Sequence, residues 1–356
     1  MKRHTVKPGL LIALATLGFG VPFAPSQTDA PGKVQVHMVI TNEAVQDGDN
    51  APVLKAEDVQ VKQGKNTVRV THLIPAQGNN AALQLFLLID DTCDTSIGNN
   101  LTDIRDFVNA LPATTAVAIG YMSNANVQLT QDFTTDHSLA AKAIRLPLGR
   151  LSTQDSPYLS LISLLKRWPQ QKVRREIIMV SDGIDRLRGT GAGTSQLNGM
   201  QSSRYQMGMP SNRNLYGGLP SATRMPIISV DVDPASQLSQ RYGVIVHGIY
   251  SPGVGRIGRN AWEAQMGQSG IGQIADETGG EYFALGYQNA VSFKPYLDRL
   301  QKVFDNQYYL VFDAVPEKKA SLQRIKISTE GIKTEIAAAD NVWVPLKTEA
   351  DAAPDN

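Results

Sequence analysis

The sequence predicts an α/β fold, with a doubly wound, mostly parallel sheet and a small accessory β-sandwich formed by the N- and C-terminal segments. The first observation is a set of apolar runs without polar alternation, such as Leu85–Ile89, which are typical of strands buried on both faces. The second is that such strands alternate with helical segments from Ala82 to about Val303. The third is that short β-segments flank this region on both sides, so the two ends of the chain can pair.

The elements of the α/β region can be placed in order. The predicted strands are Leu83–Ile89, Thr115–Met122, an antiparallel edge strand near Val127–Thr130, Glu176–Ser181, Gly243–Ile249 and Glu281–Phe283. The predicted helices are Leu101–Ala110, Asp136–Ile144, Ser156–Trp168, Ala261–Glu277 and Ala290–Phe304. Pro169 ends the third helix, because the residue before a proline resists the α conformation. Glycine just beyond the fourth helix is typical of a left-handed cap.

The predicted organisation has five parts, with one insertion. They are residues 1–30 as a signal peptide of undefined cleavage site, 31–80 as N-terminal β-segments of the sandwich, 81–305 as the α/β domain with a flexible insertion at 187–226, 306–346 as C-terminal β-segments and 347–356 as a disordered tail. The insertion is rich in Gly, Ser, Asn, Gln and Met, and it is either disordered decoration or a lid that grips a ligand.

Composition and the N-terminus narrow the class of protein. A hydrophobic fraction of 42% and a charged fraction of 19% indicate a globular protein. A net charge of +1 without a basic stripe argues against nucleic-acid binding. Met1–Pro8 is basic and Gly9–Phe23 is apolar but short, as in a signal peptide, so we expect export to the periplasm or the extracellular space. No stable membrane span is expected unless this segment stays uncleaved as an anchor.

Carboxylates follow two of the predicted strands directly. Asp90 and Asp91 come after Leu85–Ile89, and Asp182 comes after Glu176–Ser181. Ligands of parallel sheets collect at the carboxyl ends of strands, and oxygen-bearing side chains suit a hard divalent cation. The sequence therefore predicts a metal site or a polar-ligand site at this edge.

These motifs stand in a recognisable order. They are Asp90-Asp91-Thr92-Cys93-Asp94 after a strand, Asp155-Ser156-Pro157-Tyr158 before a helix, Val180-Ser181-Asp182-Gly183 at a strand end, and the later segments Gly248–Tyr250, Ile274–Tyr282 and Asn306–Leu310. The series resembles the von Willebrand factor type A (VWA) domain, and more closely the VWA-related secreted proteins of acidobacteria. The resemblance spans roughly Val34 to Pro345.

The resemblance implies a metal-ion-dependent adhesion site. It assigns as metal ligands Asp90, Thr92, Asp94, Ser156 and Asp182, holding Mg²⁺, or else Ca²⁺ or Mn²⁺. The family has serine where this chain has Asp94, which adds a negative charge that strengthens cation binding and favours Ca²⁺. The alternative is a degenerate motif that holds no metal. With a metal site, we expect Asp182→Ala to abolish cation binding and to leave the fold intact.

The resulting functional hypothesis is a non-enzymatic adhesion or assembly protein that binds a protein or a cell-envelope ligand at this edge. The alternatives are a metal-free VWA scaffold that recruits through 187–226, and a metal-assisted hydrolase that uses the same carboxylates. Cys93 is expected on an exposed loop but not as a nucleophile, because neighbouring aspartates raise the pKa of a thiol. The histidines form no zinc motif, and His247 is expected inside a buried strand.

Overall fold

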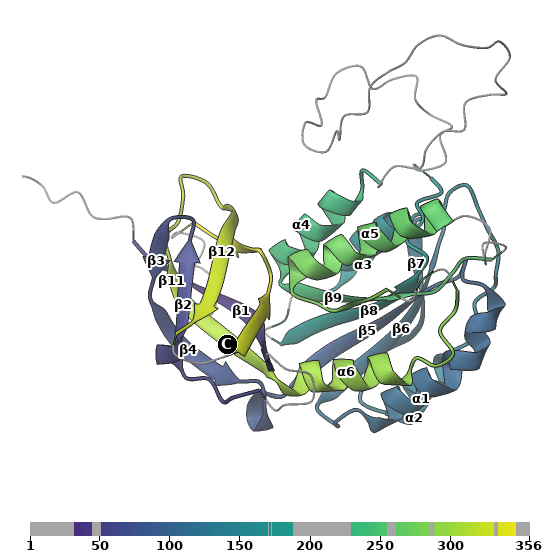
Figure 1. Ribbon diagram of the computed structural model, residues 1–356, viewed down its shortest axis with the longest axis horizontal. Helices are drawn as coiled ribbons and strands as arrows, with labels where there is room; N and C mark the ends of the chain where they lie inside the picture. Colours follow the sequence, from purple (N-terminus) through teal and green to yellow (C-terminus); the bar gives the residue numbers. More distant parts are fainter. Residues whose placement is uncertain are drawn as a thin grey trace, which may run out of the picture.

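The structure is a computed structural model of the 356-residue chain. It describes residues 32–44, 51–169, 171, 173–187, 229–254, 261–284, 286, 288–330 and 334–346. The predicted signal peptide, nearly all of the predicted insertion and the predicted C-terminal tail lie outside the described residues. Figure 1 shows an α/β body built on one sheet, with a β-sandwich beside it.

The central sheet has six strands in the order β10-β9-β8-β5-β6-β7. The strands are β5 (Leu83–Asp90), β6 (Thr115–Ser123), β7 (Asn126–Thr134), β8 (Arg174–Ser181), β9 (Val244–Tyr250) and β10 (Tyr282–Phe283). All neighbours pair in parallel except β7, which runs antiparallel to β6 at the edge. The predicted mostly parallel sheet and its antiparallel edge strand are therefore confirmed.

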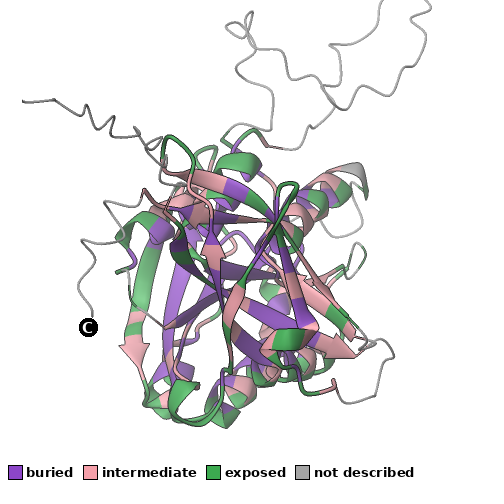
Figure 2. Cartoon of the chain, turned by 90° about the vertical axis from the view of Figure 1, so that its left-hand side faces the viewer, coloured by how far each residue is buried: buried purple, intermediate pink, exposed green. Residues whose placement is uncertain are grey.

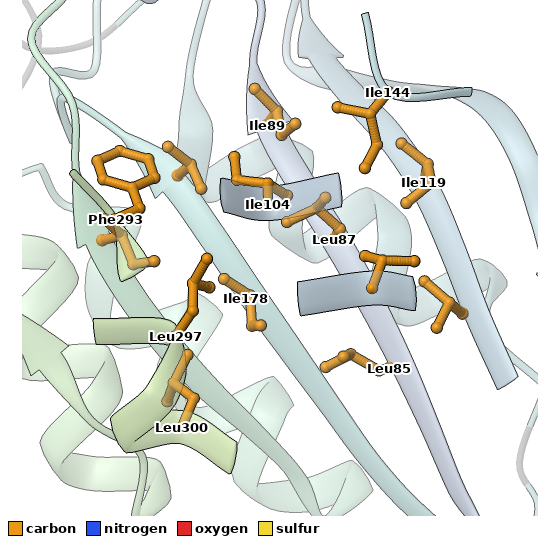
Figure 3. Close-up of a cluster of buried hydrophobic side chains, with 14 of the residues drawn as sticks. Leu85, Leu87, Ile89, Ile104, Ile119, Ile144, Ile178, Phe293, Leu297 and Leu300 are labelled. Carbon is orange, nitrogen blue, oxygen red and sulfur yellow. The ribbon is translucent and has the colours of Figure 1, made fainter. Parts of the chain in front are cut away.

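Helices cover both faces of this sheet (Figure 1). One layer contains α1 (Leu101–Ala110), α2 (His137–Ala143) and α6 (Lys294–Asp305), and the other contains α3 (Pro157–Arg167), α4 (Val232–Tyr242) and α5 (Ala261–Thr278). Alternate residues of β5 enter two separate cores, because successive side chains of a strand point to opposite faces. Leu85, Leu87 and Ile89 pack with the first layer, as Figure 3 shows, whereas Phe86 and Leu88 pack with the second.

The two ends of the chain form the β-sandwich together. One sheet has the order β13-β1-β11-β4 and the other β14-β12-β2-β3. Their strands are β1 (Val34–Ala44), β2 (Val59–Gln63), β3 (Asn66–Val68), β4 (Val70–Pro75), β11 (Gln307–Ala314), β12 (Ser321–Thr329), β13 (Thr334–Ala338) and β14 (Asn341–Val344). The first N-terminal strand pairs antiparallel with β11. Figure 2, viewed from the sandwich side, shows that the strands on this side contain buried residues.

A buried arginine joins the sandwich to the α/β body. Arg174, at the start of β8, donates hydrogen bonds to the carbonyl oxygens of Phe304 (2.9 Å) and Ala81 (2.8 Å). It also donates to Oε1 of Gln307, the first residue of β11, over 2.7 Å. These three acceptors lie where the chain crosses between the two parts, so Arg174 holds the junction together.

Two helices differ from the sequence prediction. The predicted helix Ala290–Phe304 begins only at Lys294, because Oδ2 of Asp103 on α1 accepts hydrogen bonds from the backbone N–H groups of Phe293 (2.9 Å) and Lys294 (3.2 Å). Helix α4 was not predicted, since its polar sequence adjoins the polar insertion. Among the described residues, no helix is long and apolar enough to cross a membrane.

Candidate functional site

The carboxyl ends of β5 and β8 bring Asp90 and Ser181 together, because these two strands are neighbours. The Ser181 hydroxyl donates to Oδ2 of Asp90 over 2.6 Å, and the backbone N–H of Thr92 donates to Oδ1 over 2.9 Å. Asp90 is only 3% exposed. Both of its oxygens therefore already accept hydrogen bonds from the protein.

Asp182 forms a buried ion pair with Arg186, four residues further along the chain. Nη2 of Arg186 lies 2.5 Å from Oδ2 of Asp182, and the two side chains are 5% and 1% exposed. Nη1 of Arg186 also donates to the carbonyl oxygen of Ile184 over 3.2 Å. Oδ1 of Asp182 accepts from the backbone N–H of Ile184 over 2.9 Å. A guanidinium thus meets the carboxylate that the family resemblance assigns to a cation.

The three remaining predicted ligands have separate surroundings. Oδ1 of Asp94 accepts hydrogen bonds from the backbone N–H (2.9 Å) and the hydroxyl (2.5 Å) of Ser96, at the start of the 3₁₀ helix η3 (Thr95–Asn100). The Ser156 hydroxyl accepts from the backbone N–H of Leu159 over 3.3 Å and so caps helix α3. Thr92 is buried, and its Oγ1 has no hydrogen-bond partner.

This arrangement does not fit a resident divalent cation. Mg²⁺ and Ca²⁺ need several oxygen atoms that point at one position. Here the oxygens of Asp90 and Asp182 accept from protein donors, and Arg186 supplies the positive charge. Within the part of the chain that the structure describes, no group of three or more His, Cys, Asp or Glu side chains is placed to hold a metal ion. The metal site stays a prediction, and the contacts favour the metal-free alternative.

Burial also changes the protonation of this site. Burial, followed by the negative charge of Asp182, raises the pKa of Asp90 to about 6, although Arg186 and the hydrogen bonds from Ser181 and Thr92 act in the opposite direction. Burial is likewise the largest effect on Arg186 and lowers its pKa, but the charges of Asp182 and Asp90 outweigh it and the net pKa is raised. The guanidinium is therefore charged at neutral pH.

The raised pKa of Asp90 predicts a pH-dependent stability. Because the pKa in the fold exceeds the ordinary value of 3.8, the protonated form contributes stability below about pH 4 that is lost as the pH rises through about 6. We expect this group to lower the free energy of unfolding by about 3 kcal/mol across that range. Urea titrations of wild type and Asp90→Asn from pH 4 to pH 7 measure it, with Asp94→Asn as the control. Identical pH profiles for wild type and Asp90→Asn contradict it.

The single cysteine corrects a sequence prediction. Cys93 was expected on an exposed loop, but its side chain is fully buried. Its Sγ lies 3.9 Å from the carbonyl oxygens of Val180 and Ser251. Burial, and then the charges of Asp90 and Asp182, raise the pKa of the thiol well above its usual range. The thiol is thus protonated at neutral pH.

Asp91 faces away from this cluster and anchors a neighbouring loop. Its oxygens pair with both Nη atoms of Arg145 at 2.7 and 2.8 Å, and Oδ1 also accepts from the backbone N–H of Leu148 over 3.1 Å. The guanidinium of Arg145 stacks on the Tyr121 ring, 3.7 Å from its centroid. The Tyr121 hydroxyl exchanges hydrogen bonds of 2.7 Å with the backbone N–H and carbonyl of Arg145. These contacts therefore hold the first half of the segment 145–151 in place.

Residues 145–151, which we call the leucine loop, present apolar side chains to solvent. Leu146, Leu148 and Leu151 are 43%, 53% and 49% exposed, whereas Pro147 between them is buried. Asp155 holds the other end: its Oδ2 accepts from the backbone N–H of Ser152 over 2.6 Å. The carbonyl of Asp155 accepts from the backbone N–H of Arg186 over 2.9 Å. Asp155 therefore binds both the end of the leucine loop and the segment that carries Arg186.

A buried hydrogen bond between a histidine and a glutamate lies away from this edge. Nε2 of His247 is 2.7 Å from Oε2 of Glu176, near the start of β8, and both side chains are fully buried. Nδ1 of His247 accepts from the backbone N–H of Glu281 over 3.0 Å, so the ring proton lies on Nε2. The prediction that His247 is a buried core residue is confirmed.

Sequence reasoning named Asp91 and Asp155 at this edge but not their supporting roles, and it did not single out Arg186 or Arg145. Asp182 and Arg186 are four residues apart in an irregular segment, where the i, i+4 pairing rule of helices does not apply. Asp91 and Arg145 are 54 residues apart, and nothing local in the sequence indicates that they meet.

Comparisons with known proteins concern the fold alone. No family model and no curated protein matches the sequence. A von Willebrand factor type A protein from Catenulispora acidiphila is 10% identical, with a TM-score of 0.37, over 91% of this chain and 76% of its own. An aerotolerance-related membrane protein from Bacteroides fragilis is 12% identical, with a TM-score of 0.39, over 63% and 99%. The type V pili tip protein Mfa5 from Porphyromonas gingivalis is 12% identical, with a TM-score of 0.36, over 86% and 67%. The strand order and the two helix layers of this chain themselves define a doubly wound α/β fold.

Proposed function

We propose that this chain is an exported, non-enzymatic binding protein that engages a protein partner through the leucine loop, at the carboxyl edge of its VWA-like sheet. The observation that carries the proposal is the loop itself, in which an ion pair fixes the backbone while three leucines stay exposed. A rigid backbone loses little entropy when it binds, so more of the contact energy appears as affinity.

The chemistry of the loop indicates the character of the partner. Arg150 is exposed between Leu148 and Leu151, so one basic side chain adjoins the apolar surface. A partner with an apolar contact face and acidic residues beside it would complement both features. The basic N-terminal segment followed by an apolar run supports the proposed export.

The buried carboxylates support a binding role over hydrolysis. Asp90 and Asp182 are 3% and 1% exposed, and every one of their oxygens accepts a hydrogen bond from this chain. A general base or a nucleophile must reach its substrate within hydrogen-bond distance. The leucine loop, by contrast, is accessible to a partner as it stands.

Replacing the leucines tests the proposal. The triple variant Leu146→Ser, Leu148→Ser, Leu151→Ser should lose partner binding by tenfold or more, because each buried leucine contributes about 1.5 kcal/mol or more. The measurement immobilises the full chain, exposes it to an envelope extract of its source and quantifies each retained protein against the variant.

The matched control is Leu129→Ser, Leu139→Ser, which removes two leucines that are 54% and 47% exposed on β7 and α2. A protein retained by wild type and by this control but lost with the triple variant supports the proposal. Retention that the triple variant leaves unchanged, while its thermal unfolding matches wild type, overturns it.

A further inference from the structure

We infer that the guanidinium of Arg186 occupies the place of a divalent cation at this sheet edge, and that removing it turns Asp90, Thr92 and Asp182 into a cation site. The inference concerns a different set of atoms from the leucine loop, so the two proposals can fail separately. It rests on contacts, burial and charge balance around one side chain.

The charges around Arg186 balance. Asp90 and Asp182 place two carboxylates inside the protein, and burial of unpaired charges is costly. The Arg186 guanidinium contacts Asp182 directly and neutralises its charge. The same guanidinium also interacts electrostatically with Asp90. The Arg186 guanidinium thus compensates negative charge here, as a metal ion does in a site of this kind.

The space around the ion pair is filled. A Cβ atom on Gly253 would overlap Oδ2 of Asp182 and would lie 2.7 Å from Nη2 of Arg186, so the chain closes directly over the ion pair. The covering segment is held in place, because the backbone N–H of Val254 donates to the carbonyl of Thr92 over 2.9 Å. With the guanidinium in place, this side of Asp182 has no room for an ion and its water ligands.

A buried oxygen atom near these carboxylates has no partner. Oγ1 of Thr92 is buried without a hydrogen bond, and an unsatisfied buried hydroxyl is destabilising. Thr92 belongs to the loop whose backbone N–H bonds to Asp90. One hydroxyl and two carboxylates are hard oxygen ligands, with a total charge that balances a divalent ion once Arg186 is gone.

The test is titration of Mn²⁺ into chelator-treated full-length chain, followed by calorimetry and by the Mn²⁺ electron paramagnetic resonance signal. Wild type should show no saturable binding at millimolar Mn²⁺. Arg186→Ser should bind one ion per chain with saturation below millimolar, and Mn²⁺ should raise its melting temperature. Adding Asp90→Asn to this variant should weaken the binding by tenfold or more.

Two controls separate the site from general charge effects. Arg186→Lys keeps the positive charge and should not bind Mn²⁺. Arg145→Ser removes another arginine of this edge, which pairs with Asp91 and not with Asp90 or Asp182, and this variant should not bind Mn²⁺ either. Binding by wild type, or equal binding by Arg145→Ser and Arg186→Ser, overturns the inference.

A folding defect does not hide the answer. If Arg186→Ser is unfolded without metal, refolding in the presence of Mn²⁺ supports the inference, and failure to refold with Mn²⁺ contradicts it. Arg186→Gln supplies a second reading, because glutamine can still donate to Asp182 but carries no charge. Stabilisation of Arg186→Gln by Mn²⁺ supports the inference, and equal melting temperatures with and without the ion count against it.

Discussion

Asp182→Ala is expected to lower the free energy of unfolding by about 3–5 kcal/mol, because it leaves the guanidinium of Arg186 buried without its carboxylate. The sequence predicted the opposite for the fold, since a residue at a strand end looked dispensable. The structure corrects the premise of that expectation, because Asp182 is 1% exposed and is in direct contact with Arg186. Urea denaturation at neutral pH measures the change.

A double-mutant cycle attributes this loss to the ion pair. In Asp182→Leu, Arg186→Met both charges are gone, so the loss should be smaller than the sum of the two single changes by several kcal/mol. Asp94→Ala is the control, because it removes only the half-buried cap of a 3₁₀ helix and should cost about 1 kcal/mol. If Asp182→Ala costs no more than Asp94→Ala, the pair does not carry the stability that we assign to it.

Gly267→Ala is expected to be the second strongly destabilising change, with a loss of about 3 kcal/mol. A Cβ on Gly267 would overlap the backbone carbonyl oxygen of Asp182, and a Cβ on Gly183 would overlap the backbone of Gly267. Helix α5 therefore lies directly on the loop that presents Asp182. Backbone on both sides cannot rearrange as a side chain does, so the helix must shift. Thermal and urea unfolding measure the effect.

Another glycine of the same helix provides the matched control. A Cβ on Gly272 would meet only the Tyr282 ring, at 3.2 Å, and alanine is the better helix former by about 1 kcal/mol. We expect Gly272→Ala to change stability by less than about 1 kcal/mol. Equal effects of the two substitutions would mean that the contact between α5 and the Asp182 loop is not tight.

Much of the fold could be predicted because its signals are local. A run such as Leu85–Ile89 has no polar alternation, and in the structure its residues enter cores on both faces of the sheet. The alternating segments at the chain ends indicated half-buried strands, and β1 and β11 do pair. Helix α6 was predicted to start too early, because the group that caps it, Asp103, lies about 190 residues away in the sequence.

The candidate site was predictable only in part. The strand pattern placed Asp90 and Ser181 at one edge of the sheet, because that placement depends only on which strands are neighbours. It did not indicate which way each side chain turns, and adjacent aspartates turn differently: Asp90 joins the buried cluster, whereas Asp91 pairs with Arg145. The neutralising role of Arg186 depends on the tertiary path of residues 182–186, which residue types alone do not define.

The most direct test of the account is photo-crosslinking in the full chain, with a photoreactive phenylalanine derivative at Leu148 and, as the control, at Leu139. The reaction is run with an envelope extract of the source, in excess chelator and in millimolar Mg²⁺. The account predicts an adduct with one protein partner from position 148, equally strong under both conditions and absent from position 139. An adduct that requires Mg²⁺, or one that forms equally from both positions, would contradict a metal-free partner site at the leucine loop.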